Sequence, residues 1–373
     1  MVLQNIEKKT AIPIYKQVYG FLQEDIAQGR YNNTGKLPAE PELAALYGVS
    51  RVTIRKMLSI FEKKGIIVKQ KGKGTFIADE KNRINKKKLF RVICSDYEVI
   101  SNKNKAPLNY FIITRLMNGI IRAMDYCDVL IDILSLAGLP NEQYYQSIIN
   151  YNNTVPAGLL FIKTETPGLY NMLHNKKIPF VVIDSTYKMI NAAPEYNLVC
   201  SNHAAGVAEA VSYLHESGRK KIGYIGILNE KNQAHNDRFK GYKKGLGECG
   251  ITFNLKLTEE SAGTESDGYQ AAKRLLSREK NIDAVVCSTD IRAFGAMKAL
   301  KDIGKKIPSD IAVIGFDNLN EAEFSTPSLA SIDTRLADQG YAAAVMLAGA
   351  VKAGNYIPAI KIIEPKLIIR QSV

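Results

Sequence analysis

The sequence predicts two parts of different architecture, a small α+β domain at the N-terminus and a two-lobed α/β domain after it. Apolar residues recur at helical spacing up to about residue 61 and then give way to two short β-branched runs. After a charged, aperiodic stretch, β-rich runs alternate with helical ones, which is typical of parallel βαβ units. The positive charge lies in the first part, because residues 1–90 hold 18 Lys+Arg and 8 Asp+Glu, or +10 of the total +13.

Two helices are expected first. Residues 13–29 carry apolar side chains every three or four positions and stop at a glycine, as an amphipathic helix does. A short second helix fits residues 41–47. Acidic residues occupy its first turn, where the helix dipole favours them.

A third helix and a hairpin complete the first part. Ser50 follows a tight turn and is the expected N-cap of a helix that ends near Gly65. The β-branched runs 66–68 and 75–77 flank a basic, glycine-rich segment, which indicates a hairpin. Three helices and a hairpin make a winged helix-turn-helix domain, which we assign to residues 1–79.

A polar linker is expected over residues 80–89, because this segment is charged and has no apolar periodicity. Residues 90–373 then form the α/β domain. Their pattern divides near residues 195–202 into two similar halves, which predicts two doubly wound lobes with a cleft between them. Strands are expected at 89–94, 129–134, 158–162, 180–183, 221–227, 283–287 and 311–316, and a terminal strand at 360–369.

Charge and composition narrow the partners. A concentrated positive field attracts nucleic acid first and an anionic membrane surface second. No apolar run approaches the roughly 18 residues that span a bilayer, and the N-terminus lacks a signal-peptide pattern, so we expect a cytoplasmic protein. The five cysteines are odd in number and widely spaced, with no C-x-x-C pair, so we expect free thiols.

Cofactor, metal and catalytic signals are weak. Residues 245–250 fit G-x-G-x-x-G, but they follow a helical stretch instead of a strand, so we expect no dinucleotide cofactor. The four histidines lack ligand spacing, and no metal site is expected. No nucleophile or acid/base pair stands out, so we expect no enzyme activity and assign no catalytic residue.

The first turn of the third helix is the expected DNA-reading surface. In a helix-turn-helix this end enters the major groove, where arginine pairs with guanine and threonine meets a phosphate or a thymine methyl group. A solvated face of an ordinary helical domain is the plainer alternative, but the ordered helices and basic wing favour DNA. The candidate residues are Ser50, Arg51, Thr53, Arg55, Lys56, Lys71, Gly72, Lys73 and Gly74.

Four segments carry a resemblance to a known family: residues 13–29, Leu37-Pro38-Ala39-Glu40 with Leu43-Ala44, Val49-Ser50-Arg51 with Thr53-Ile54-Arg55, and Gly72-Lys73-Gly74-Thr75-Phe76. Together they resemble the GntR family of bacterial regulators over residues 10–78. The resemblance implies recognition-helix contacts by the third helix and a wing tip in the minor groove. Pro41 stands where the family commonly has arginine, so a DNA contact of relatives is missing here.

The second part resembles the LacI-type effector domain, itself similar to periplasmic sugar-binding proteins. The resemblance lies in residues 218–226, Arg238-Phe239-Lys240-Gly241-Tyr242, Ser288-Thr289-Asp290 with Ala293-Phe294-Gly295-Ala296, and residues 311–318. A GntR-type reader joined to such a domain looks like the AraR group of sugar-responsive repressors.

The candidate effector residues lie mostly at expected strand ends, where ligands gather in open α/β sheets. By the resemblance, Arg238 and Asp317 grip ring hydroxyls, Thr289 stands where relatives often have asparagine, and Asp184 and Lys163 reach in from the other lobe. Aspartates at strand ends also cap helices, and Arg238 or Lys163 on a solvated surface is the structural alternative. The full set is Asp96, Tyr110, Phe111, Lys163, Asp184, Arg238, Thr289, Asp290 and Asp317.

These observations predict a homodimeric transcription factor that represses carbohydrate genes and leaves its operator when a small sugar binds. Its partners are double-stranded operator DNA and a monosaccharide effector. Two alternatives stay open: an activator, or a regulator that answers to a phosphosugar or purine. A different class is a sugar-binding or sugar-metabolising protein with an accessory DNA-binding domain.

Overall fold

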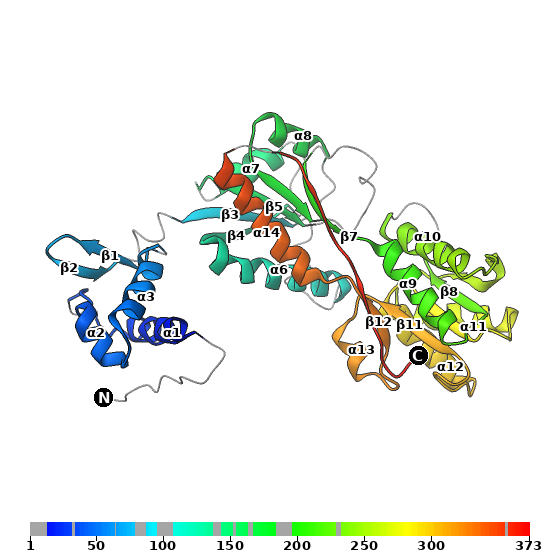
Figure 1. Ribbon diagram of the computed structural model, residues 1–373. Helices are drawn as coiled ribbons and strands as arrows, with labels where there is room; N and C mark the ends of the chain where they lie inside the picture. Colours follow the sequence, from blue (N-terminus) through cyan, green and yellow to red (C-terminus); the bar gives the residue numbers. More distant parts are fainter. Residues whose placement is uncertain are drawn as a thin grey trace. The chain divides into compact units, whose positions relative to one another are not determined.

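The structure is a computed structural model of the 373-residue chain. It divides into two compact units, Met1–Lys88 and Leu89–Val373 (Figure 1). The described residues are 13–31, 34–63, 65–78, 87–94, 107–136, 143–151, 154–162, 167–183, 196–228, 233–354 and 357–373.

The N-terminal unit has the predicted three helices and hairpin, in the predicted order. Its apolar core gathers one face of each helix around Leu22, Leu43, Ile54 and Phe61, all of which are fully buried. The winged helix-turn-helix fold is confirmed. Its elements are α1 (Ile14–Ala27), α2 (Glu40–Tyr47), α3 (Arg51–Lys63), β1 (Ile67–Gln70) and β2 (Gly74–Ile77).

The turn between α2 and α3 and the wing both depend on glycine. Gly48 ends α2 in the left-handed conformation, with φ of 64°. In the wing, β1 and β2 pair antiparallel, and Gly72 and Gly74 have φ of 76° and 118°. The strand β2 is also tied to the segment before α2, because the Leu37 amide donates to Thr75 at 2.8 Å. This hydrogen bond fixes the wing beside the segment that leads into α2.

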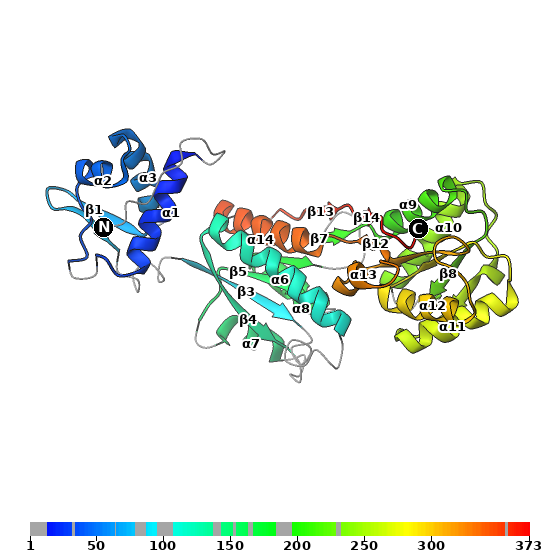
Figure 2. The ribbon, with the colours of Figure 1, turned by 90° about the horizontal axis from the view of Figure 1, so that it is seen from below.

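The first lobe of the C-terminal unit is a six-stranded sheet in the order β13-β7-β6-β5-β3-β4. The helices α6 and α14 pack on one face, while α7 and α8 pack on the other (Figure 2). The elements are β3 (Lys88–Cys94), α6 (Pro107–Cys127), β4 (Val129–Ser135), α7 (Tyr144–Asn150), β5 (Gly158–Ile162), α8 (Pro167–Asn175), β6 (Phe180–Ile183), β7 (Asn197–Ser201), α14 (Leu336–Ala353) and β13 (Ile360–Ile363).

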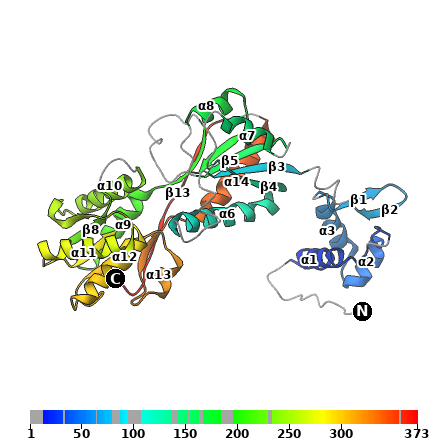
Figure 3. The same cartoon turned by 180° about the vertical axis from the view of Figure 1, so that it is seen from behind.

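The second lobe repeats this architecture with a sheet in the order β14-β12-β11-β10-β8-β9. The helices α9 and α10 pack on one face, and α11 and α12 pack on the other (Figure 3). The elements are α9 (His203–Glu216), β8 (Ile222–Gly226), α10 (Gln233–Glu248), β9 (Thr258–Glu260), α11 (Glu265–Arg278), β10 (Ala284–Cys287), α12 (Asp290–Asp302), β11 (Ala312–Phe316), α13 (Asn320–Phe324), β12 (Ala330–Asp333) and β14 (Lys366–Ile368).

Two expectations about this unit are wrong. The lobes are not consecutive halves of the chain, because α14 and β13 return to the first lobe after the second is complete. The predicted terminal strand 360–369 is two strands, with β13 parallel to β7 in one sheet and β14 antiparallel to β12 in the other. Only Glu364 and Pro365 separate them. Periodicity could not reveal this, since both pieces carry apolar residues typical of a strand.

Close helix packing explains the return of α14. A Cβ on Gly119 of α6 would lie 1.8 Å from the Ala337 carbonyl oxygen, and one on Gly340 would lie 2.1 Å from that of Leu116. The two helices therefore approach backbone to backbone, which larger residues would prevent.

The G-x-G-x-x-G segment has a structural role of the same kind. Gly245 lies inside α10, and a Cβ there would come within 2.9 Å of Ala208 Cα on α9. Gly250 follows the helix with φ of 70°. Within the described ranges, no helix is both long and apolar enough to cross a bilayer, and no group of three or more His, Cys, Asp or Glu could hold a metal ion.

Candidate DNA-binding surface and effector site

The amino end of α3 is an exposed, basic surface. Ser50 caps the helix, since the Thr53 amide donates to Ser50 Oγ at 3.2 Å and the two hydroxyls lie 2.9 Å apart. Arg51 is exposed and projects from the first helical position. The cap can therefore receive a phosphate, and Arg51 next to it can reach a base edge.

Arg55 and Lys56 are exposed but already have contacts within the unit. Arg55 Nε donates to Glu40 Oε2 at 2.7 Å, and Lys56 Nζ lies 4.4 Å from the centroid of the Tyr15 ring. Both contacts are at the surface and contribute little to stability. They hold the Arg55 side chain toward α2 and the Lys56 side chain toward α1 without burying their charge.

The wing tip supplies the second basic surface. Lys71, Gly72, Lys73 and Gly74 are all exposed, and the two glycines have positive φ. The tip therefore combines two lysine side chains with two glycines, which have no side chain to keep the backbone from a close approach. All nine predicted DNA-binding residues lie in the described structure on the recognition helix, its cap or the wing.

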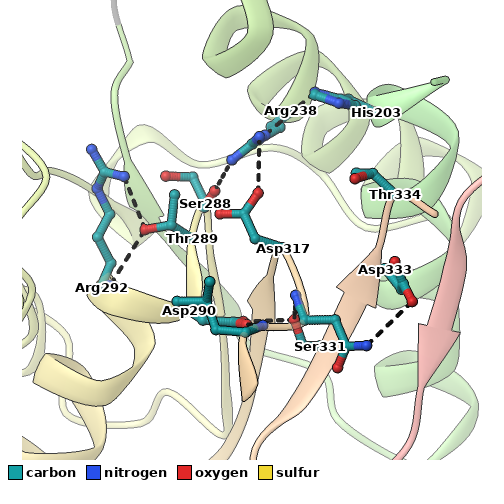
Figure 4. Close-up of polar contacts among 12 residues, drawn as sticks. His203, Arg238, Ser288, Thr289, Asp290, Arg292, Asp317, Ser331, Asp333 and Thr334 are labelled. Carbon is teal, nitrogen blue, oxygen red and sulfur yellow. Dashed lines mark hydrogen bonds and ion pairs between the residues drawn. The ribbon is translucent and has the colours of Figure 1, made fainter. Parts of the chain in front are cut away.

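Arg238 is the centre of a buried polar cluster in the second lobe, which is the candidate effector site. Its guanidinium donates to the Ser288 backbone oxygen at 2.5 Å and contacts Asp317 Oδ1 and His203 Nδ1 at 3.4 Å each (Figure 4). The guanidinium carbon also lies 3.7 Å from the centroid of the Phe316 ring. Arg238 and Asp317 are 7% and 5% exposed, so the pair is held in a protein environment of low dielectric.

The turn after β11 presents Asp317 to this cluster. Asp317 has φ of 104° and Asn318 has φ of 50°, which non-glycine residues rarely adopt. Three hydrogen bonds fix the turn: Asp317 N to Ile332 O at 2.9 Å, Asn318 N to Ser331 Oγ at 3.0 Å, and Leu319 N to Asp290 Oδ2 at 2.7 Å. Strain of this kind persists where neighbouring contacts over-determine the backbone, as they do here.

The structure corrects the expectation for Asp290. The side chain is fully buried, and its two carboxylate oxygens accept from the Ser331 hydroxyl and the Leu319 amide. Burial, followed by the nearby Asp317 carboxylate, raises the pKa of Asp290 well above its usual range. Asp290 is thus a positioning residue for the Asp317 turn, with no surface for a ligand.

Thr289 caps α12, which is the helix after β10. Its hydroxyl accepts from the Arg292 amide at 3.4 Å and from Arg292 Nη1 at 3.1 Å. The side chain is 2% exposed and lies next to the Ser288 carbonyl that Arg238 contacts. The cap brings Thr289 to the same sheet edge as Arg238 and Asp317 (Figure 4).

The first lobe shows less of its predicted site. Asp96, Lys163 and Asp184 lie outside the described residues. Phe111 packs against the apolar core under α6, and the Arg115 guanidinium lies 5.1 Å from its ring centroid. Tyr110 is half-buried in the same helix.

Sequence reasoning missed three residues of the cluster. His203 and Phe316 contact Arg238, and Arg292 is a buried arginine beside Thr289. The available signals were an arginine in the first turn after a strand end and an aromatic residue next to Asp317. Only the packing of α9 against β11 shows that His203 belongs with them, with its ring centroid 5.0 Å from that of Phe316.

Comparison with known proteins supports both units. Residues 14–77 match the model of the bacterial regulatory proteins of the gntR family, and residues 211–373 match that of the periplasmic binding protein-like domain. The repressor PurR of Mannheimia succiniciproducens is 32% identical over 196 residues, which are 52% of this chain and 57% of the relative. The repressor CytR of Escherichia coli is 29% identical over 217 residues, which are 58% of this chain and 62% of the relative.

Solved structures agree on the fold. The complex of the transcriptional regulator CelR with cellobiose has a TM-score of 0.63 at 19% identity, covering 90% of this chain and all of that one. A LacI-family regulatory protein from Chloroflexus aggregans also has a TM-score of 0.63, at 21% identity, covering 76% and 98%. The chain matches 57% to 63% of the length of the first curated relatives.

The fold defines a class of protein: a winged helix-turn-helix domain joined to a two-lobed α/β domain. Within that class, residues 14–77 belong to the gntR family of bacterial regulatory proteins, and residues 211–373 belong to the periplasmic binding protein-like domains.

Proposed function

We propose that the protein is a sequence-specific transcriptional regulator, a repressor of carbohydrate-utilisation genes that a small sugar releases from its operator. The observation that carries the proposal is the presence in one chain of an exposed recognition helix and a buried polar cluster at a sheet edge. The relatives PurR and CytR are repressors, which supports repression over activation. We place the protein in the cytoplasm, where bacterial operator DNA lies.

In the proposed DNA complex, α3 enters the major groove. Arg51 and Arg55 read base edges, with Arg55 leaving Glu40 to do so, while Ser50 and Thr53 hold a phosphate through the helix cap. Lys56 neutralises a further phosphate. The wing places Lys71 and Lys73 against the minor groove, and Gly72 and Gly74 let the backbone come close.

In the proposed effector complex, Arg238 and Asp317 bind vicinal hydroxyl groups, and Thr289 completes the wall of the second lobe. We propose that Asp184, Lys163, Asp96, Tyr110 and Phe111 contribute from the first lobe. The structurally similar regulator CelR binds cellobiose in its solved complex, which supports a carbohydrate as the effector class. A phosphosugar or purine effector is the second candidate. Because Arg292 is a buried cation, it favours an effector with a negative charge.

The mechanism is a shift between two populations. Effector binding favours a closed arrangement of the two lobes, and this arrangement has lower affinity for the operator. By linkage, the operator must weaken effector binding by the same factor. No catalytic step is required, and we propose that the protein is not an enzyme.

We further propose a homodimer, because winged domains read palindromic half-sites as pairs. A groove of about 460 Å³ lies between α12 and the segment after α13. Phe324 beside it is 79% exposed, and α13 also carries Glu321 and Glu323. A second copy could place its Phe324 in this groove with its glutamates near the lysines of the first. The lining is Phe294, Met297, Lys298, Lys301, Lys305, Ile307, Ser325, Thr326 and Pro327.

The function is tested in two steps. Selection of genomic fragments by the purified full chain should recover palindromic sites, and one sugar from a thermal-shift screen should lower the affinity for them. A sugar that binds without changing DNA affinity would contradict effector control. Turnover of that sugar, with no specific DNA binding, would favour the enzyme alternative.

The dimer surface is tested by light scattering. Phe324→Asp should convert the dimer to a monomer, while Leu255→Asp, which changes another exposed apolar residue at 66% exposure, should leave it unchanged. A dimeric Phe324→Asp protein would place the interface elsewhere.

A further inference from the structure

Arg292 is a buried cation whose contacts are all neutral. The side chain lies in the first turn of α12 and is 2% exposed. Its Nε and Nη2 donate to the Ser261 backbone oxygen at 3.3 and 3.0 Å, and its Nη1 donates to Thr289 Oγ1 at 3.1 Å. In the part of the chain that the structure describes, no carboxylate lies within ion-pair distance of Arg292. Buried charges are normally paired, because desolvation without an opposite charge is costly.

The neighbouring carboxylates are committed to other groups. Asp317 pairs with Arg238, and Asp290 accepts from Ser331 and Leu319. Asp267 accepts from the Thr264 amide and hydroxyl at 3.0 and 2.7 Å, which caps α11 and lowers the pKa of Asp267. Asp237 accepts from Gln233 at 2.7 Å. The guanidinium groups of Arg238 and Arg292 therefore both lie at this sheet edge, and one described carboxylate, that of Asp317, forms an ion pair there, with Arg238.

The loop after β9 lies against the buried guanidinium of Arg292. Gly263 is half-buried in this loop, and a Cβ there would meet only Arg292 Nη2, at 3.5 Å, among the described residues. Ser261 in the same loop has a buried hydroxyl with no hydrogen-bond partner among those residues. Ala262 between them is exposed. The loop thus places a residue without a side chain beside the guanidinium and supplies a buried hydroxyl that has no hydrogen-bond partner among the described residues.

We infer that the effector carries an oxyanion, a carboxylate or a phosphate group, and that Arg292 binds it. A guanidinium offers two parallel N–H donors whose spacing matches two oxygens of such a group. Arg238 and Asp317 then bind the hydroxyl groups of the same molecule. The inference rests on the proposed function and narrows the effector to a sugar acid or a sugar phosphate.

The test uses pairs of ligands that differ only in the oxyanion. The full chain is titrated calorimetrically with glucuronate, galacturonate, glucose 6-phosphate and ribose 5-phosphate, and with the parent sugars glucose, galactose and ribose. One anionic member should bind about 10- to 100-fold more tightly than its parent, which is the range for hydrogen bonds to a charged group. A carboxylate or a phosphate as the best ligand identifies the source of the oxyanion.

The role of Arg292 is tested with Arg292→Met, which keeps the length of the side chain and removes its charge. This variant should lose the preference for the anionic member of the pair and bind the parent sugar as the wild type does. Arg292→Lys should retain part of the preference, because it keeps the charge but not the planar fork. Arg274→Met on α11 removes an exposed arginine and should bind both ligands normally.

Equal or tighter binding of a parent sugar, absence of binding by every anionic member, or an unchanged preference in folded Arg292→Met overturns the inference. If Arg292→Met does not fold, the comparison of ligand pairs on the wild-type chain still decides. Specific DNA binding that a neutral sugar releases would refute this inference alone. Failure of specific DNA binding would refute the proposed function and leave the binding result valid.

Discussion

The recognition helix and the effector cluster use arginine in opposite ways. Arg51 at the start of α3 is exposed, and Arg55 has one surface ion pair. Arg238 and Arg292 are buried, and each contacts two or more groups of the surrounding lobe. DNA brings a dense array of acceptors, so its reader needs only to display donors. A small ligand brings few groups, so its site must be organised in advance by the protein.

This contrast predicts its largest effect at Arg238. Arg238→Ala removes a buried guanidinium and with it the ion pair to Asp317. Breaking a buried pair on one side costs about 3–5 kcal/mol, and the effector response should be lost. Urea unfolding of the C-terminal unit and effector titration measure both losses.

The matched control is Arg274→Ala, which removes an exposed ion pair with Glu259 and should cost about 0–1 kcal/mol. Operator binding should survive in both variants, because the winged unit has its own core. An unchanged effector response in Arg238→Ala and in Asp317→Ala would mean that the effector binds elsewhere.

The second effect lies on the exposed side of the comparison. Arg51→Ala should weaken specific operator binding by about 1–3 kcal/mol if this side chain reads a base. Its melting temperature should stay near that of the wild type, because an exposed side chain contributes little to folding. Gel-shift titration on operator and on random DNA separates base reading from phosphate contact, since a phosphate contact weakens both equally.

The wing tests backbone conformation separately from contacts. Gly74→Ala should destabilise the winged unit by about 1–2 kcal/mol, because an L-residue with positive φ is strained. The added Cβ also lies 2.7 Å from Lys36 Cε, but this end of a flexible side chain can move. Gly20→Ala in α1 has open space and a helical conformation, so it should be stabilising instead. The same sign in both variants would refute the conformational explanation.

The smallest effect is a pH dependence in the effector lobe. The pKa of Asp290 in the folded state is raised above its unfolded value of about 3.9. The folded state therefore binds this proton more tightly, and the associated stability is lost as pH rises from the unfolded value through the raised one. Asp290→Asn cannot ionise and should lack this loss.

Urea unfolding from pH 4 to pH 8 measures the free energy of unfolding of the wild type and of Asp290→Asn. As pH rises, the wild type should lose stability relative to Asp290→Asn. Glu279→Gln is the control of opposite sign, because the hydrogen bond and charge of Lys221 lower the pKa of Glu279. The Glu279→Gln substitution should therefore lower the free energy of unfolding more at high pH than at low pH. Parallel pH profiles for wild type and Asp290→Asn would show that Asp290 does not titrate in this range.

The sequence was a good guide to elements whose signals are local. The cap at Ser50, the glycines of the wing and the apolar stripe of α3 each lie within a few residues of what they determine. The same holds for strands such as β5, which is a continuous apolar run. The candidate DNA-binding residues could be placed on one helix and one hairpin because these elements have local sequence signals, and their contacts with DNA stay a prediction.

The effector cluster was predicted less completely because its members come from distant elements. Thr289 and Asp317 were candidates because they follow expected strands, whereas Arg238, which lies in α10, was a candidate through the resemblance to LacI-type effector domains. His203 comes from α9 and contacts Arg238 only because both helices pack on the same face of the sheet. The role of Asp290 was misjudged, since nothing in the sequence shows that Ser331 and Leu319 would enclose its carboxylate.

The sequence by itself determined the order of the helices and the hairpin in the N-terminal unit, because these follow from periodicity, caps and turn residues. The family of each unit could be recognised from short motifs within it. Only the tertiary structure decided which lobe receives α14 and β13, that Asp290 supports a turn, and that Arg292 is buried with no carboxylate of the described residues within ion-pair distance. Those outcomes depend on packing between residues far apart in the chain, where the free energy of burial outweighs local preference.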